Sequence, residues 1–173
     1  MFIKEVLIRK MPEAADKKAL TVFYNRCLAD CANLCFQSTF CSADIQRNKY
    51  GQPCIAVESH QQIYLSLSHS GEYLAAMACS TPCGVDIERI KKRPYFEMWQ
   101  EIRHSIEPKE PSNLADFYQY WTRKEAAWKV FACQAPATMK DLPVVCDRNL
   151  AYKGVILKNL EGPIGYALSI AYL

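Results

Sequence analysis

The sequence predicts an α+β fold built as a pseudo-dimer, in which two similar halves each pack a long helix on a three-stranded antiparallel sheet. A long helical pattern occurs in each half, and about three β-like runs accompany each helix. A strand with two acidic residues, at positions 84–88, lies near the centre of the chain. No repeat of the residues themselves relates the halves, so their similarity is one of element order. We expect residues 1–82 and 83–173 to form the halves, with the active site in the cleft between them.

The composition is that of a globular protein of modest charge. The 173 residues are 50% hydrophobic and 12% aromatic, enough for one domain or two small fused halves with a proper core. The net charge of +3 is too small to favour a nucleic acid as partner. Two basic runs, at residues 9–10 and 91–93, face either an acidic partner or solvent.

The cysteine pattern and the apolar runs predict the compartment. The nine cysteines include no CxxC spacing, and Cys27, Cys31 and Cys35 recur at helical spacing, typical of small buried hydrophobic side chains. Such a set fits a reducing cytoplasm. Lys4 interrupts the first apolar stretch, so no signal peptide is expected, and no apolar run is long enough to cross a bilayer. We expect a soluble cytoplasmic protein with no membrane partner.

In the first half, residues 2–8 predict a strand, and Pro12 opens a helix of about 20 residues. Residues 54–57, 63–67 and 73–79 have the composition of strands, and Ser68–Gly71 is expected to join the last two as a tight turn.

In the second half, residues 84–88 predict a strand, and its period of two puts Asp86 and Glu88 on one face. A helix is expected over residues 95–105, and a longer one from Ser112 or Asn113 to about Ala132. Three further β-like runs complete the chain, at residues 142–146, 152–157 and 165–172.

The long helix of the second half carries charges at unusual places. Glu125 and Lys129 lie one turn apart on one face, whereas Lys124 lies in the apolar arc and must either extend to solvent or meet a buried anion. Trp121 and Trp128 are expected to be core residues. Two carboxylates from a strand, a third from a helix and nearby lysines predict a site for Mg²⁺ and phosphate.

Four blocks of residues together resemble a known family. They are residues 49–53, 66–70, 84–88 and 121–129, with the sequences KYGQP, SLSHS, GVDIE and WTRKEAAWK. In this order they resemble the 4′-phosphopantetheinyl transferases of the monomeric two-half type. The chain departs from the family where Gln52 replaces a usual lysine, where glycines are missing after Lys129, and in its shorter first half.

The resemblance implies a reaction and a metal. Such enzymes transfer 4′-phosphopantetheine from coenzyme A to a serine of an acidic apo acyl or peptidyl carrier protein and release 3′,5′-ADP. It implies Asp86, Glu88 and Glu125 as ligands of Mg²⁺, with Mn²⁺ as a possible substitute. Glu125 is also the candidate base for the serine proton, and Lys129 would neutralise phosphate charge.

The resemblance also implies contacts with coenzyme A. His69 and Ser68 would meet a phosphate, and Lys124 and Gln52 belong to the same expected binding surface. Arg26 on the first helix either reaches the 3′-phosphate or is an ordinary exposed arginine.

Two other functions remain open from the sequence. One is a non-catalytic module that binds coenzyme A or a carrier protein through a decayed site. The other is a hydrolase that uses Ser68 or Ser70 with His69, although no G-x-S-x-G elbow is present and adjacent residues in a turn rarely face each other.

Overall fold

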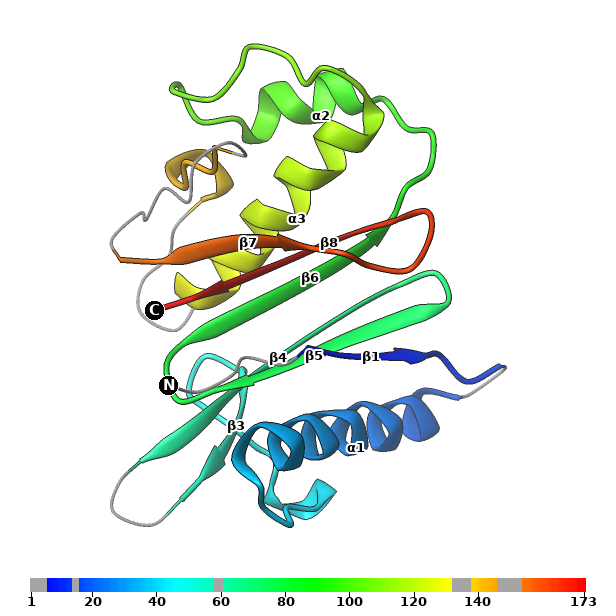
Figure 1. Ribbon diagram of the computed structural model, residues 1–173, viewed down its shortest axis with the longest axis vertical. Coiled ribbons are helices and arrows are strands. Elements are labelled where there is room, and N and C mark those ends of the chain that lie inside the picture. The colour runs from blue at the N-terminus through cyan, green and yellow to red at the C-terminus, as the bar shows by residue number, and fades with distance from the viewer. Residues whose placement is uncertain (1–5, 14–15, 58–60, 132–137, 146–153) are drawn as a thin grey trace.

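The computed structural model describes residues 6–13, 16–57, 61–131, 138–145 and 154–173. Within these ranges the strands form two antiparallel sheets, and the longest helix beside each sheet covers one face of it (Figure 1). The elements are β1 (Val6–Lys10), α1 (Lys17–Phe36), β2 (Gln46–Arg47), β3 (Pro53–Ala56), β4 (Gln62–Ser70), β5 (Tyr73–Cys79), β6 (Cys83–Arg89), α2 (Tyr95–Ile102), α3 (Leu114–Phe131), β7 (Ile156–Leu160) and β8 (Tyr166–Tyr172). This confirms the α+β class with antiparallel sheets.

The molecule is layered as helix, sheet, sheet and helix. The first sheet has the order β1-β5-β4-β3-β2, and the second has the order β6-β8-β7. In Figure 1, α1 lies below the first sheet, and α3 runs from above the second sheet down across β8 and β7. Apolar side chains of β5, β6 and β8 fill the space between the sheets, Met77, Val85 and Ile170 among them. The hydrophobic effect therefore holds the two sheets together as well as each helix to its sheet.

The prediction of three strands in each half is wrong for the first sheet, in which the described residues form five. The strand predicted at residues 2–8 is β1, which runs over Val6–Lys10 and pairs with β5 at one edge. At the other edge β2, only two residues long, pairs with β3. A strand this short leaves too little periodicity for detection in the sequence.

The first helix begins at a side-chain cap. Asp16 accepts a hydrogen bond of 2.7 Å from the backbone N–H of Ala19, which satisfies one of the free donors of the first turn. The expected shared face of the cysteines is confirmed for Cys27 and Cys31, which are buried against the first sheet, whereas Cys35 is partly buried. None of the three forms a disulfide within the described part of the chain.

The predicted tight turn over Ser68–Gly71 is wrong. The pairing of β4 with β5 continues to Ser70, which lies opposite Tyr73, so that only Gly71 and Glu72 form the turn. Gly71 adopts a φ of 55°, in the left-handed region that favours glycine. Serine and histidine are common in turns, but here they are the last residues of a strand.

In the second half, the acidic strand, the following helix and the long helix are confirmed as β6, α2 and α3. Asn113 caps α3 by accepting from the N–H of Asp116, at 2.9 Å. The strand predicted at residues 142–146 is wrong over 142–145, which have no regular structure. The run at 152–157 falls partly outside the described residues; the strand there, β7, begins at Ile156.

Trp121 is half-buried, but Trp128 is 39% exposed and is not the core residue that its helical position predicts. The helices of the described part of the chain are all too short or too polar to cross a membrane.

Candidate functional site

The site is built where α3 crosses β6. Strand β6 is the edge strand of its sheet, and Gly84 near its start lies directly under the helix. A Cβ atom at Gly84 would overlap the backbone carbonyl of Ala126 and press against the side chain of Lys129. Only glycine therefore allows the strand and the helix to come this close, and their close approach brings Asp86 beside Lys129.

Asp86 is the most buried acid of the strand, with 5% of its surface exposed. Its Oδ1 accepts hydrogen bonds from the Ser68 hydroxyl at 2.7 Å and from the Lys129 ammonium at 2.9 Å. Its Oδ2 is buried and has no hydrogen-bond partner among the described residues. Burial raises the pKa of Asp86, and the charge of Lys129 opposes that shift. Native proteins rarely leave a buried carboxylate oxygen unpaired, so Oδ2 is suited to contact a bound cation.

Glu88 lies two residues further along the same face of β6. Its Oε2 accepts a hydrogen bond of 2.7 Å from the hydroxyl of Ser70. Each carboxylate of the strand is thus held by a serine of β4, Asp86 by Ser68 and Glu88 by Ser70.

Glu125 contributes a third acidic group from α3. Its pKa is raised to about 7, first by burial and then by the negative charges of Asp86 and Glu88, against the opposing charge of Lys129. The three carboxylates therefore share one electrostatic neighbourhood, although they come from segments far apart in the sequence. A divalent cation is the simplest counter-charge for such a set.

The described residues do not include a ready-made group of three or more acidic, histidine or cysteine ligands. One oxygen of Asp86, Oδ1, is already in an ion pair of 2.9 Å with the ammonium of Lys129. The donors nevertheless fit a hard cation: all are carboxylate oxygens, and Asp86 Oδ2 has no competing hydrogen bond among the described residues. Asp86, Glu88 and Glu125 are the residues that would hold such an ion.

Lys129 joins the long helix to the acidic strand. Its ammonium donates to Asp86 Oδ1 at 2.9 Å and to the carbonyl of Val85 at 2.7 Å, so it bridges α3 and β6. Gln52, from the KYGQP block, donates its side-chain amide to the backbone carbonyl of Lys129. The loop of the first half thus meets the end of α3 beside the carboxylates.

Lys124 does not lie in this site. It has no exposed surface, and its ammonium forms an ion pair of 2.9 Å with Glu107, which is also buried. It also donates to the carbonyls of Met139 and Leu142, at 3.0 and 2.7 Å. The expectation that Lys124 must extend to solvent or meet a buried anion is resolved in favour of the anion. This position does not fit the predicted contact with coenzyme A, because the ammonium is enclosed.

His69 lies apart from Ser68 and Asp86. Successive side chains of a strand point to opposite faces, so the serines of β4 face β6 while His69 faces α1. Its ring stacks on Tyr24 of α1, with the ring centroids 5.3 Å apart. The hypothesis of a hydrolase that pairs His69 with Ser68 or Ser70 is therefore wrong, because the imidazole and the hydroxyls lie on opposite faces of the sheet.

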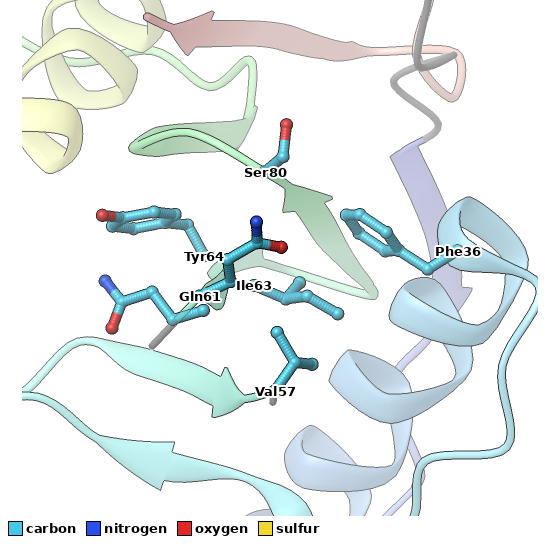
Figure 2. Close-up of a pocket in the computed structure, with 7 residues that line it drawn as sticks. Phe36, Val57, Gln61, Ile63, Tyr64 and Ser80 are labelled. Carbon is cyan, nitrogen blue, oxygen red and sulfur yellow. The ribbon is translucent and has the colours of Figure 1, made fainter. Parts of the chain in front are cut away.

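Two cavities in the described part of the chain lie away from the carboxylates. The larger, of about 830 Å³, is lined by Phe36, Val57, Gln61, Gln62, Ile63, Tyr64 and Ser80. Figure 2 shows the apolar side chains of Phe36, Val57 and Ile63 lying close to one another there. Arg26 is exposed and lines the second, of about 520 Å³, beside the first turns of α1. Neither cavity includes Asp86, Glu88 or Glu125.

Sequence reasoning missed three features of the structure around these charged residues. The roles of Gly84 and of the Glu107 partner of Lys124 depend on contacts between distant segments, which no local pattern encodes. The role of Ser70 had a signal, because Ser66, Ser68 and Ser70 alternate along the strand. Because residues 68–71 were expected to form a turn, the alternation was not attributed to a strand.

A family model described as the 4′-phosphopantetheinyl transferase superfamily matches residues 82–168, a range that contains all three carboxylates and Lys129. The curated relative "4′-phosphopantetheinyl transferase gsp" of Aneurinibacillus migulanus is 28% identical over 87 residues, which cover 47% of this chain and 35% of the relative. The match thus spans about a third of that relative's length.

Proposed function

The chain belongs to the 4′-phosphopantetheinyl transferase superfamily, and on that premise we propose that it transfers 4′-phosphopantetheine from coenzyme A to a serine of an apo acyl or peptidyl carrier protein. The observation that carries the proposal is the charge coupling of Asp86, Glu88 and Glu125 inside the family match. In the reaction, the serine oxygen bonds to the β-phosphorus of coenzyme A. The bond from that phosphorus to the bridging oxygen breaks, and 3′,5′-ADP leaves.

The proposed base is Glu125. In the metal-free protein the pKa of Glu125 is raised to about 7, and a cation bound to the same carboxylates would lower it. The ionised carboxylate would then be ready to accept the serine proton at neutral pH. Its raised pKa has a clear physical cause in burial and in the charges of its two acidic neighbours. The proton that leaves the serine hydroxyl ends on Glu125 in this scheme.

The proposed counter-charges are a divalent cation and Lys129. Mg²⁺, or Mn²⁺ in its place, would be held by Asp86, Glu88 and Glu125 and would supply positive charge to the diphosphate of coenzyme A. The ammonium of Lys129 lies at the edge of the same site and would add charge on the phosphate side. Ser68 supports the arrangement by its hydrogen bond to Asp86.

We propose a monomeric enzyme whose carrier partner is acidic. The exposed lysines at positions 91 and 92 directly follow the acidic strand, and they would attract such a carrier. We propose neither a nucleic acid nor a membrane as a partner.

The test is to incubate the protein with coenzyme A, Mg²⁺ and an apo carrier protein and to weigh the carrier by mass spectrometry. We expect a gain of one phosphopantetheine, which a chelator abolishes. The variants Asp86→Ala and Glu125→Ala should lose transfer and remain folded. Asp116→Ala is the control, because it removes a half-buried carboxylate nine residues earlier in the same helix, about 13 Å along its axis. Thermal unfolding accompanies it, since Asp116 also accepts a hydrogen bond of 2.8 Å from the N–H of Ser112.

The outcomes separate the alternatives. Binding of coenzyme A or of the carrier without a mass gain would favour the non-catalytic module. Near-normal transfer by Asp86→Ala or Glu125→Ala would reject the assignment of the carboxylates.

A further inference from the structure

A row of three serines on β4 faces the edge strand β6. Ser66 accepts from the backbone N–H of Val85 at 3.0 Å, and Ser68 donates to Asp86 at 2.7 Å. Ser70 makes two contacts at once, since it accepts from the N–H of Arg89 at 3.1 Å and donates to Glu88 Oε2 at 2.7 Å. The row thus contacts both the backbone and the carboxylates of β6.

The two contacts of Ser70 fix the direction of its hydroxyl. A serine hydroxyl has one proton to donate and two lone pairs. Because a lone pair is occupied by the N–H of Arg89, the proton is directed to Glu88 and the hydroxyl is not a free rotor. The bond joins the end of β4 to the carboxylate of the neighbouring sheet.

Glu88 needs such a restraint more than Asp86 does. Asp86 is buried and has a short side chain, whereas Glu88 is only half-buried and has one more rotatable bond. Ordering a glutamate side chain costs conformational entropy, which a ligand must otherwise overcome when it binds. Partners that orient carboxylate ligands from the outside often decide how tightly a metal binds.

We infer that Ser70 is a positioning residue, which holds the Glu88 carboxylate in the orientation needed to bind a divalent cation together with Asp86. The inference rests on the proposed function for the identity of the carboxylate site. Ser70 itself touches neither the cation nor the substrate. It acts through one oxygen of Glu88 and leaves the other oxygen for the ion.

The test measures Mn²⁺ binding by the whole protein, from the electron paramagnetic resonance signal of free Mn²⁺, with and without coenzyme A. We expect Ser70→Ala to weaken Mn²⁺ binding about tenfold, the lower end of the effect of removing an outer partner of a metal ligand. Ser70→Thr keeps the hydroxyl and should bind Mn²⁺ as the unchanged protein does. Ser66→Ala is the matched control, because it removes a hydroxyl from the same row that contacts only backbone.

Three results would overturn the inference. The first is unchanged Mn²⁺ affinity in Ser70→Ala, and the second is an equal loss in Ser66→Ala, which would indicate a general effect on the strand edge. The third is no measurable Mn²⁺ binding by the unchanged protein in either condition. Thermal unfolding of each variant confirms that the folded protein is being compared.

The transfer assay separates this inference from the proposed function. If the unchanged protein transfers phosphopantetheine and Ser70→Ala binds Mn²⁺ normally, the inference fails and the function stands. If Mn²⁺ binding depends on Ser70 but no transfer occurs to any apo carrier, the function fails and the positioning role stands.

Discussion

Replacing Lys124 distinguishes a structural role for this lysine from a role in binding coenzyme A. The ammonium and the carboxylate of Glu107 are both fully enclosed, 2.9 Å apart. Removing one partner of such a pair leaves the other as an uncompensated buried charge, at a cost of about 3–5 kcal/mol. Burial lowers the pKa of Lys124, and the charge of Glu107 opposes that shift, as expected for a cation that depends on its partner.

The expected loss in Lys124→Met lies near the lower limit, about 3 kcal/mol. The remaining carboxylate would keep two backbone donors, since Glu107 also accepts from the N–H groups of His104 and Val144. In a domain of this size such a loss lowers the melting temperature by about 6–12 °C. Glu107→Gln should also destabilise the protein, because the buried ammonium of Lys124 loses its counter-charge and keeps only uncharged oxygens as partners, the carbonyls of Met139 and Leu142 among them.

The assay is urea unfolding of the two single variants and the double variant, at several pH values near neutral. The double variant should lose less than the sum of the single losses, by about 1–3 kcal/mol, because neither charge remains unpaired. Coenzyme A affinity of folded Lys124→Met, measured by calorimetry well below its melting temperature, should be unchanged. If Lys124→Met were as stable as the unchanged protein but bound coenzyme A clearly more weakly, the structural role would be refuted. The contact of Lys124 with coenzyme A that the resemblance implies would then be supported.

Two further predictions concern the junction of β6 and α3. Gly84→Ala should destabilise the protein by about 2 kcal/mol or more and weaken Mn²⁺ binding, because the added Cβ would overlap the carbonyl of Ala126. Urea unfolding and Mn²⁺ affinity equal to those of the unchanged protein would contradict this prediction. For Glu125, the second prediction concerns pH. Between pH 4.5 and about 7 this residue keeps its proton in the metal-free folded protein but loses it in the unfolded chain, where its pKa has the ordinary value of 4.5. Its contribution to the free energy of unfolding therefore falls as the pH rises from 4.5 to about 7, and Glu125→Gln should remove that part of the decrease in a urea series across this window. If the free energy of unfolding depended on pH identically in the unchanged protein and in Glu125→Gln, the raised pKa of Glu125 would be contradicted.

Much of the fold was predictable because its signals are local. The long helices have an apolar period, and β6 alternates acids with Val85 and Ile87, so both were identified from spacing alone. The short edge strand β2 and the end of β4 were not, because two residues carry no period and serines are ambiguous between strand and turn. The pairing that extends β4 to Ser70 is a contact with β5, and it overrides the local preference.

The sequence by itself determined which residues have the chemistry for a cation and a phosphate: Asp86 and Glu88 on one face of a strand, and Glu125 with Lys129 on one face of a helix. It also indicated that Lys124, in the apolar arc of the helix, either extends to solvent or meets a buried anion. The tertiary structure decided where each charge is used, because partners across a sheet or a helix are distant in the chain. The packing of α3 on Gly84 places Lys129 against Asp86, and the serines of β4 hold the carboxylates of β6. The enclosed Glu107 pairs with Lys124 and keeps this lysine out of the site. Electrostatic energy depends on distance and burial, and both are properties of the folded chain.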